Sequence, residues 1–101
     1  MSEQAARVDF ARINAAALAA LPALLARWLP DGHWQGAEYI ARNPRRADRR
    51  SGSFKINRNG RWSDFATKDG GGDPISLAAY VANISQVAAA RELGRALGVA
   101  T

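Results

Sequence analysis

One short stretch of the chain combines positively charged side chains with aromatic rings. In residues 53–65, SFKINRNGRWSDF, cations alternate with bulky apolar residues. A basic surface that follows phosphates, with rings on which bases stack, binds single-stranded nucleic acid with little sequence preference. The residues that we expect to contact nucleic acid are Arg42, Arg45, Arg46, Arg49, Arg50, Lys55, Arg58, Arg61 and Lys68, with Trp62 as the stacking candidate. The alternative is that Trp62 and both neighbouring phenylalanines point inward, which leaves electrostatic and strongly salt-dependent binding.

The positive charge of the chain is concentrated in the same region. The 101 residues carry a formal net charge of +5. Residues 42–68 hold nine Lys and Arg against two Asp, a net of +7, and the rest holds five against seven acids, a net of −2. Clustered charge of one sign is typical of a surface that meets an anionic polymer. The alternative is a solvated patch that only maintains solubility.

Other kinds of site find little support in the composition. The absence of cysteine excludes disulfides and thiolate metal sites, and a single histidine, His33, cannot build a conventional zinc site. The acidic residues of the central region do not form a metal-binding pair or triad; they are Asp48, Asp64, Asp69 and Asp73. We therefore expect no catalytic residue, no metal and no cofactor.

The elements that would position the basic stretch are predicted from local patterns. Asn59-Gly60 separates the two alternating runs, and this dipeptide favours a type I′ turn because both residues tolerate a positive φ. We predict a β-hairpin with one buried face and one basic face. Residues Glu38–Ala41 predict another strand, so the sheet region spans 34–66, with three to five antiparallel strands, and 66–72 form a loop.

Helices are predicted on both sides of this region. Residues 1–8 are expected to form a flexible tail, and residues 9–30 a helical segment with apolar residues three and four apart. Pro22 divides that segment into a helix ending near Ala20 and a second beginning near Leu21 or Pro22; a single kinked helix is the alternative.

Residues 73–98 predict two further helices. Asp73 is the expected N-cap of the first and Pro74 its first residue, Asn83 ends it, Ser85 caps the next, and Gly98 ends that one. The preceding Gly70-Gly71-Gly72 could bind phosphate at a helix N-terminus. A tight turn that lets the hairpin pack on the helix is the favoured interpretation.

Together these elements predict one α+β domain over residues 1–101, in which a small antiparallel sheet is flanked by N-terminal helices and two C-terminal helices. The length is close to the common size of a single domain. No apolar run approaches the roughly 20 residues of a membrane span. We expect a cytoplasmic protein with no membrane partner.

The run from Asn43 to Gly98 resembles the N-terminal zinc-ribbon domain of bacterial and phage DNA primases. That family has Cys-Pro-x-His, a strand and hairpin, Cys-x-x-Cys, and Gly-Gly-Asp before an apolar helix. This chain has NPRR at 43–46, DFAT at 64–67 and GGDPISL at 71–77. The four positions of the metal ligands hold Asn43, Arg46, Asp64 and Thr67. The chain therefore looks most like the metal-free variant found ahead of Toprim primase or helicase modules in phage and mobile-element proteins.

The resemblance implies a non-catalytic DNA-binding domain that binds single-stranded template for a replication primase or primase-helicase. The alternative is a protein-interaction module whose apolar helices dock a primase or helicase partner. Without a structural metal, apolar contacts must stabilise the sheet. We expect Phe54 and Trp62 to fill the space around the former metal site, or to pack the sheet against the last two helices.

Overall fold

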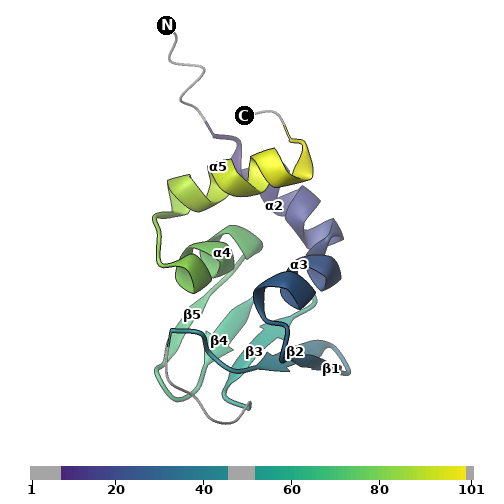
Figure 1. Cartoon of the computed structure of the whole chain (residues 1–101), viewed down its shortest axis with the longest axis vertical. Coiled ribbons are helices and arrows are strands. Elements are labelled where there is room, and N and C mark those ends of the chain that lie inside the picture. Colours follow the sequence, from purple (N-terminus) through teal and green to yellow (C-terminus); the bar gives the residue numbers. More distant parts are fainter. Residues whose placement is uncertain (1–7, 46–51, 100–101) are drawn as a thin grey trace, which may run out of the picture.

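The computed structural model describes residues 8–45 and 52–99. This part of the chain forms four helices and one five-stranded antiparallel sheet (Figure 1). The predicted α+β class, with a small antiparallel sheet between N-terminal helices and two C-terminal helices, is confirmed. The expected tail up to residue 7 and the basic residues Arg46, Arg49 and Arg50 lie outside the described residues.

The N-terminal segment is divided at the proline, as predicted. Helix α2 (Phe10–Ala19) begins at Asp9, whose carboxylate accepts a hydrogen bond from the Arg12 amide at 3.0 Å. Helix α3 (Leu21–Trp28) has Pro22 in its first turn, where the missing amide hydrogen costs no helical bond. The two helices are bent by 84°. No single helix in the described ranges is long and apolar enough to span a membrane, although α2 and α3 together meet that length and composition.

The sheet is a meander in which neighbours in sequence are neighbours in space. The order of the strands in the sheet is the same as their order in the sequence. They are β1 (His33–Gln35), β2 (Glu38–Ala41), β3 (Phe54–Asn57), β4 (Trp62–Asp64) and β5 (Asp69–Gly71). The sheet extends beyond the predicted 34–66, because β5 lies in the segment that we expected to be a loop. The two glycines of β5 give it a low intrinsic β preference. The strand forms because its backbone pairs with that of β4.

The hairpin of β3 and β4 is present, but its turn is not of type I′. Gly60 has a φ of 92°, whereas Asn59 is not among the described residues with a positive φ. The Asn57 side-chain oxygen accepts a hydrogen bond from the Asn59 amide at 3.0 Å, and the Gly60 amide donates to the Asn57 carbonyl at 2.9 Å. The side chain of Asn57 thus organises the turn, an arrangement that asparagine favours.

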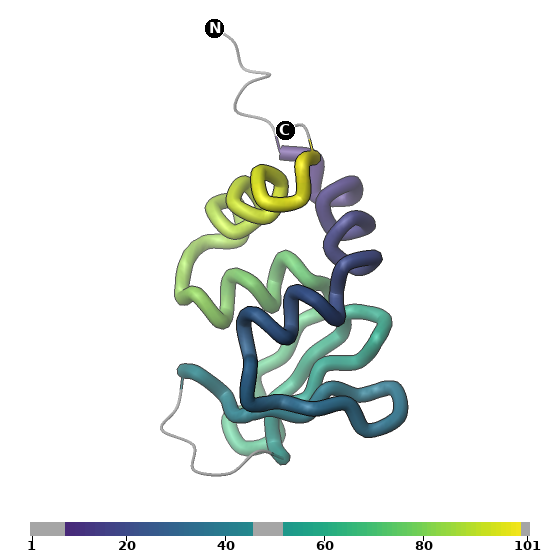
Figure 2. The backbone as a smooth tube through the Cα atoms, turned by 45° about the vertical axis from the view of Figure 1, so that its right-hand side comes forward, coloured from purple at the N-terminus to yellow at the C-terminus, as the bar shows by residue number. Residues whose placement is uncertain are grey.

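The C-terminal helices are α4 (Pro74–Ala82) and α5 (Gln86–Leu97). Their cap residues are those predicted, Asp73 and Ser85 at the N-termini and Asn83 and Gly98 at the C-termini. Both C-caps adopt the left-handed conformation that ends a helix. All four helices lie on one side of the sheet (Figure 2).

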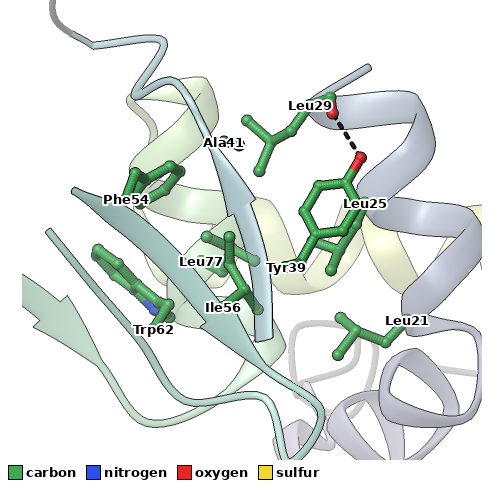
Figure 3. Packing of buried hydrophobic residues seen from close by; sticks show 9 residues of the cluster. All are labelled: Leu21, Leu25, Leu29, Tyr39, Ala41, Phe54, Ile56, Trp62 and Leu77. Carbon is green, nitrogen blue, oxygen red and sulfur yellow. Dashed lines mark hydrogen bonds between the residues drawn. The ribbon is translucent and has the colours of Figure 1, made fainter. Parts of the chain in front are cut away.

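The hydrophobic core has two layers. The first lies between the sheet and helices α3 and α4, and its buried residues are Leu21, Leu25, Leu29, Tyr39, Ala41, Phe54, Ile56, Trp62 and Leu77 (Figure 3). The Tyr39 hydroxyl donates a 2.7 Å hydrogen bond to the Leu29 carbonyl and ties β2 to the end of α3. The second layer packs α2 and α5 on α4 around Ile13, Ile75 and Leu93. The helices of the described residues therefore cover one face of the sheet and not the other.

Two phenylalanines on the sheet and its turn should respond very differently to truncation. Phe54 is fully buried, whereas Phe65 is 76% exposed. We expect Phe54→Ala to lower the free energy of unfolding by about 3–5 kcal/mol, because it removes buried apolar contacts and leaves a cavity. The matched control Phe65→Ala should change it by less than about 0.5 kcal/mol. Urea denaturation monitored by tryptophan fluorescence measures both, and equal decreases would contradict this core.

Candidate nucleic-acid interface

The strand register separates the sheet residues into a covered face and an open face. Successive side chains of a strand point to opposite faces, and paired residues share a face. Tyr39, Ile56 and Trp62 form one row across β2, β3 and β4 and lie in the core. The adjacent row, Lys55, Ser63 and Gly70, therefore lies on the open face. The open face is where the basic side chains of the hairpin can meet a ligand.

A shallow hollow of about 780 Å³ lies over this part of the sheet. Three cations from separate elements line it: Lys55 on β3, Arg61 before β4 and Lys68 in the turn before β5. Ser63 and Gly70 are also in its lining, and such small residues let a flat ligand approach the sheet closely. Two acidic residues, Glu38 and Asp69, complete its charged groups. The hollow is therefore polar and carries a net positive charge.

Phe65 is the exposed ring beside the hollow. It follows β4 and belongs to the turn that leads to β5, and its amide donates a 3.0 Å hydrogen bond to the Ser53 carbonyl. The Lys55 ammonium lies 5.9 Å from the centre of its ring, a cation–π distance. Side chains alternate between the two faces of a strand, so a pattern with Trp62 on the covered face places Phe65, three residues later, on the other; this alternation is the signal that points to Phe65.

Trp62, the stacking candidate of the sequence analysis, lines the hollow, but its ring belongs to the core together with Phe54. This agrees with the expectation that the two rings pack the sheet against a C-terminal helix, and not with stacking on a ligand. Its side chain is only 6% exposed, and its ring centre lies 4.7 Å from that of Tyr80 on α4. Its indole Nε1 donates a 2.9 Å hydrogen bond to the Ser76 hydroxyl. A Cβ on Gly71, the last residue of β5, would collide with the side chains of Trp62 and Ser76, so close packing requires a glycine there.

The other predicted cations do not join the hollow. The Arg45 guanidinium carbon lies 5.0 Å from the centre of the Tyr80 ring, and that of Arg58 lies 3.9 Å from the Trp34 ring. Arg42 lines a separate crevice. Of the predicted contacts that the structure describes, Lys55, Arg61 and Lys68 are therefore brought together, and Arg42, Arg45 and Arg58 are distributed around the sheet.

A buried polar contact lies under the edge of this surface. Asn43, after β2, and Asp64, at the end of β4, are each 1% exposed. The Asn43 amide nitrogen lies 2.7 Å from an Asp64 carboxylate oxygen and donates a second hydrogen bond, of 2.8 Å, to the Tyr80 hydroxyl. That hydroxyl in turn donates to Asp69 at 2.8 Å. We call Asn43, Asp64, Asp69 and Tyr80 the polar centre.

Side chains of the polar centre also form hydrogen bonds to the backbone of the two turns that meet there. The Asp64 carboxylate accepts hydrogen bonds from the amides of Ala66 at 2.7 Å and Thr67 at 3.3 Å. The Asn43 side-chain oxygen accepts one from the Arg45 amide at 2.8 Å. Asn43, Asp64 and Thr67 are three of the positions that the resemblance equates with metal ligands. The fourth, Arg46, lies outside the described residues. In the described ranges, no group of three or more His, Cys, Asp or Glu could hold a metal ion.

Hydrogen bonding makes Asp64 a stronger acid. Burial alone would raise its pKa, but hydrogen bonds from Asn43, from the amides of Ala66 and Thr67 and from the Ser53 hydroxyl lower the pKa below 3.8, the ordinary value. Because the pKa is lower in the folded state, ionised Asp64 stabilises the fold above its unfolded pKa, and this stabilisation disappears as the pH falls through the folded pKa.

Asp64→Asn should therefore destabilise the domain in a pH-dependent way. At pH 7 we expect a decrease of about 1.5–3 kcal/mol in the free energy of unfolding, since charge-assisted hydrogen bonds are removed. The difference between wild type and variant should shrink below about pH 4. Urea denaturation between pH 2 and 7 measures it, with the exposed Asp31→Asn as the matched control. A difference that stays constant over this range would contradict the role of the ionised carboxylate.

Comparison with known proteins adds no relative to this picture. No protein-family model, curated protein or solved structure matches the chain. The hollow, its cations and the exposed ring are therefore the features from which a function can be inferred.

Proposed function

We propose that this chain is a non-catalytic domain that binds single-stranded DNA on the open face of its sheet, as the template-binding part of a replication primase or primase-helicase. One observation carries the proposal. The exposed ring of Phe65 lies 5.9 Å from the Lys55 ammonium, and Lys55 is one of three cations from different segments that line a shallow hollow.

This arrangement matches the chemistry of an unpaired strand. Each base of a single strand has an exposed π-face, and stacking on an aromatic side chain contributes about 1–3 kcal/mol per base. Phosphates lie beside the bases and attract Lys55, Arg61 and Lys68. A ring that is 76% exposed contributes little to the core and is accessible to a base. A flat surface with small residues suits bases that lie against it.

The assignment to DNA replication rests on the resemblance to primase ribbons. Asn43 and Asp64 are 21 residues apart, and the resemblance assigns both to one metal site. In the structure they contact each other directly, which supports the correspondence of the two turns. In this chain hydrogen bonds join the turns, and the domain would serve a catalytic module carried elsewhere.

Neutralising two cations of the hollow should weaken binding and its salt dependence together. We expect Lys55→Gln with Arg61→Gln to reduce affinity for a random single-stranded oligonucleotide. The slope of log K against log salt should flatten by about 0.7 for each phosphate that the variant no longer neutralises. The matched control is Arg12→Gln with Arg95→Gln, two exposed cations on the helices. Fluorescence anisotropy across a salt titration measures both; equal weakening in the two double variants would contradict a localised site.

Removing the exposed ring should weaken binding without changing the salt slope. We expect Phe65→Ala to cost about 1–3 kcal/mol of binding free energy, because one base no longer has a ring to stack on while the phosphates stay bound. Phe65→Trp should restore the affinity, since it supplies another stacking ring. Anisotropy at two salt concentrations separates the effects. If Phe65→Ala binds as tightly as wild type, the ring is not part of the interface.

A second candidate function is docking of a primase or helicase partner. An apolar groove of about 230 Å³ between α3, α4 and α5 favours it, lined by Leu24, Trp28, Val81, Ile84 and Leu93 among others. Ile84 and nearby Val87 are large apolar residues that remain exposed. The same anisotropy titration separates the two functions: absence of binding to any oligonucleotide would favour the docking module.

A further inference from the structure

Glu38 is one of two acidic residues in the hollow, and Asp69, the other, is bound by the Tyr80 hydroxyl. Glu38 on β2 is half-buried and lines the same hollow as Lys55, Arg61 and Lys68. Its side chain has no hydrogen-bond or ion-pair partner among residues 8–45 and 52–99. A negative charge at this point repels phosphates and weakens purely electrostatic binding. Its presence therefore calls for a ligand group that a carboxylate attracts.

Hydrogen-bond donors lie next to Glu38 in the same row of the sheet. Glu38 pairs with Asn57 on β3, so both side chains are on the open face. The Asn57 side-chain oxygen is occupied by the Asn59 amide, which leaves its NH₂ group to donate. The Asn57 amide donates to the Arg61 carbonyl at 2.7 Å, which makes Arg61 the next residue of the row. Across this row, the Glu38 carboxylate can accept hydrogen bonds, and the side chains of Asn57 and Arg61 can donate them.

We infer that Glu38 recognises the Watson–Crick edge of an unpaired guanine in the bound strand, an inference that rests on the proposed function. Guanine presents two adjacent donors, N1–H and N2–H₂, beside the O6 acceptor, and unpaired bases are recognised on this edge. The two oxygens of Glu38 can accept both donors, while Asn57 or Arg61 donates to O6. Thymine offers only one donor on this edge, and cytosine and adenine each offer one amino group.

The position of the stacking ring agrees with this assignment. Asn57 and Lys55 are successive open-face residues of β3, about 7 Å apart. Lys55 also lies over the Phe65 ring. The Phe65 amide bonds to the Ser53 carbonyl and Glu38 pairs with Asn57, so Phe65 and Glu38 lie on opposite sides of Lys55 along β3. One nucleotide stacks on Phe65, the next places its base edge at Glu38, and Lys55 lies between them, where a phosphate can bind.

The test compares oligo(dT) strands that carry one central guanine, inosine, cytosine or thymine. Inosine lacks the N2 amino group and keeps the rest of the guanine edge. We expect wild type to bind the guanine strand about tenfold more tightly than the thymine strand, and inosine to lose most of that preference. Glu38→Gln should abolish the preference, because its amide NH₂ replaces one acceptor, while oligo(dT) is bound at least as tightly as by wild type. Glu92→Gln, on α5, is the matched control.

Each other outcome has a definite meaning, given that circular dichroism shows the variants folded. Equal binding of all four strands by wild type overturns this inference and leaves the proposed function standing. A guanine preference that survives in Glu38→Gln also overturns it. The same holds if wild type shows no preference and Glu38→Gln binds all four strands more tightly by the same factor. Absence of binding to any strand overturns the proposed function and this inference together.

Discussion

The contact between Asn43 and Asp64 organises the sheet side of this domain. It joins the end of β2 to the end of β4, and through Tyr80 it joins both to α4. Removing one member would leave the other buried with unmet hydrogen bonds, which costs more than the contact itself contributes. No buried side-chain nitrogen or oxygen among the described residues lacks a partner. A fully satisfied polar network of this kind favours one arrangement of the turns around it.

The same contact explains how an apolar ring comes to lie on the surface. The Asp64 carboxylate accepts the amides of Ala66 and Thr67 and so folds the turn that contains Phe65. Asp64 points into the domain, and the next side chain, that of Phe65, points away from it. Trp62, two residues earlier, is held inward by Ser76 and Tyr80. The core and the candidate interface are thus linked within four consecutive residues of β4 and the turn that follows it.

The sequence predicts those parts of the structure that depend on local signals. The break at Pro22, the caps at Asp73 and Ser85, and the bounds of β2 follow from individual residue types and short patterns. Strand β5 and the turn at Asn59 did not follow from such signals, and for Trp62 they left two expectations open, stacking on a ligand and packing against the C-terminal helices. Each depends on a partner elsewhere: β5 on pairing with β4, Trp62 on Ser76, and the turn on the Asn57 side chain.

The shortness of β1 and β5 bears on how the domain avoids aggregation. Both are outermost strands of three residues, and β5 is Asp-Gly-Gly. An outermost strand offers unpaired backbone groups to any extended chain that meets it, and short strands offer few of them. A sheet with long, apolar edge strands would be at risk of growing by strand addition. The brevity of β1 and β5 therefore limits how far another protein chain can pair with this sheet.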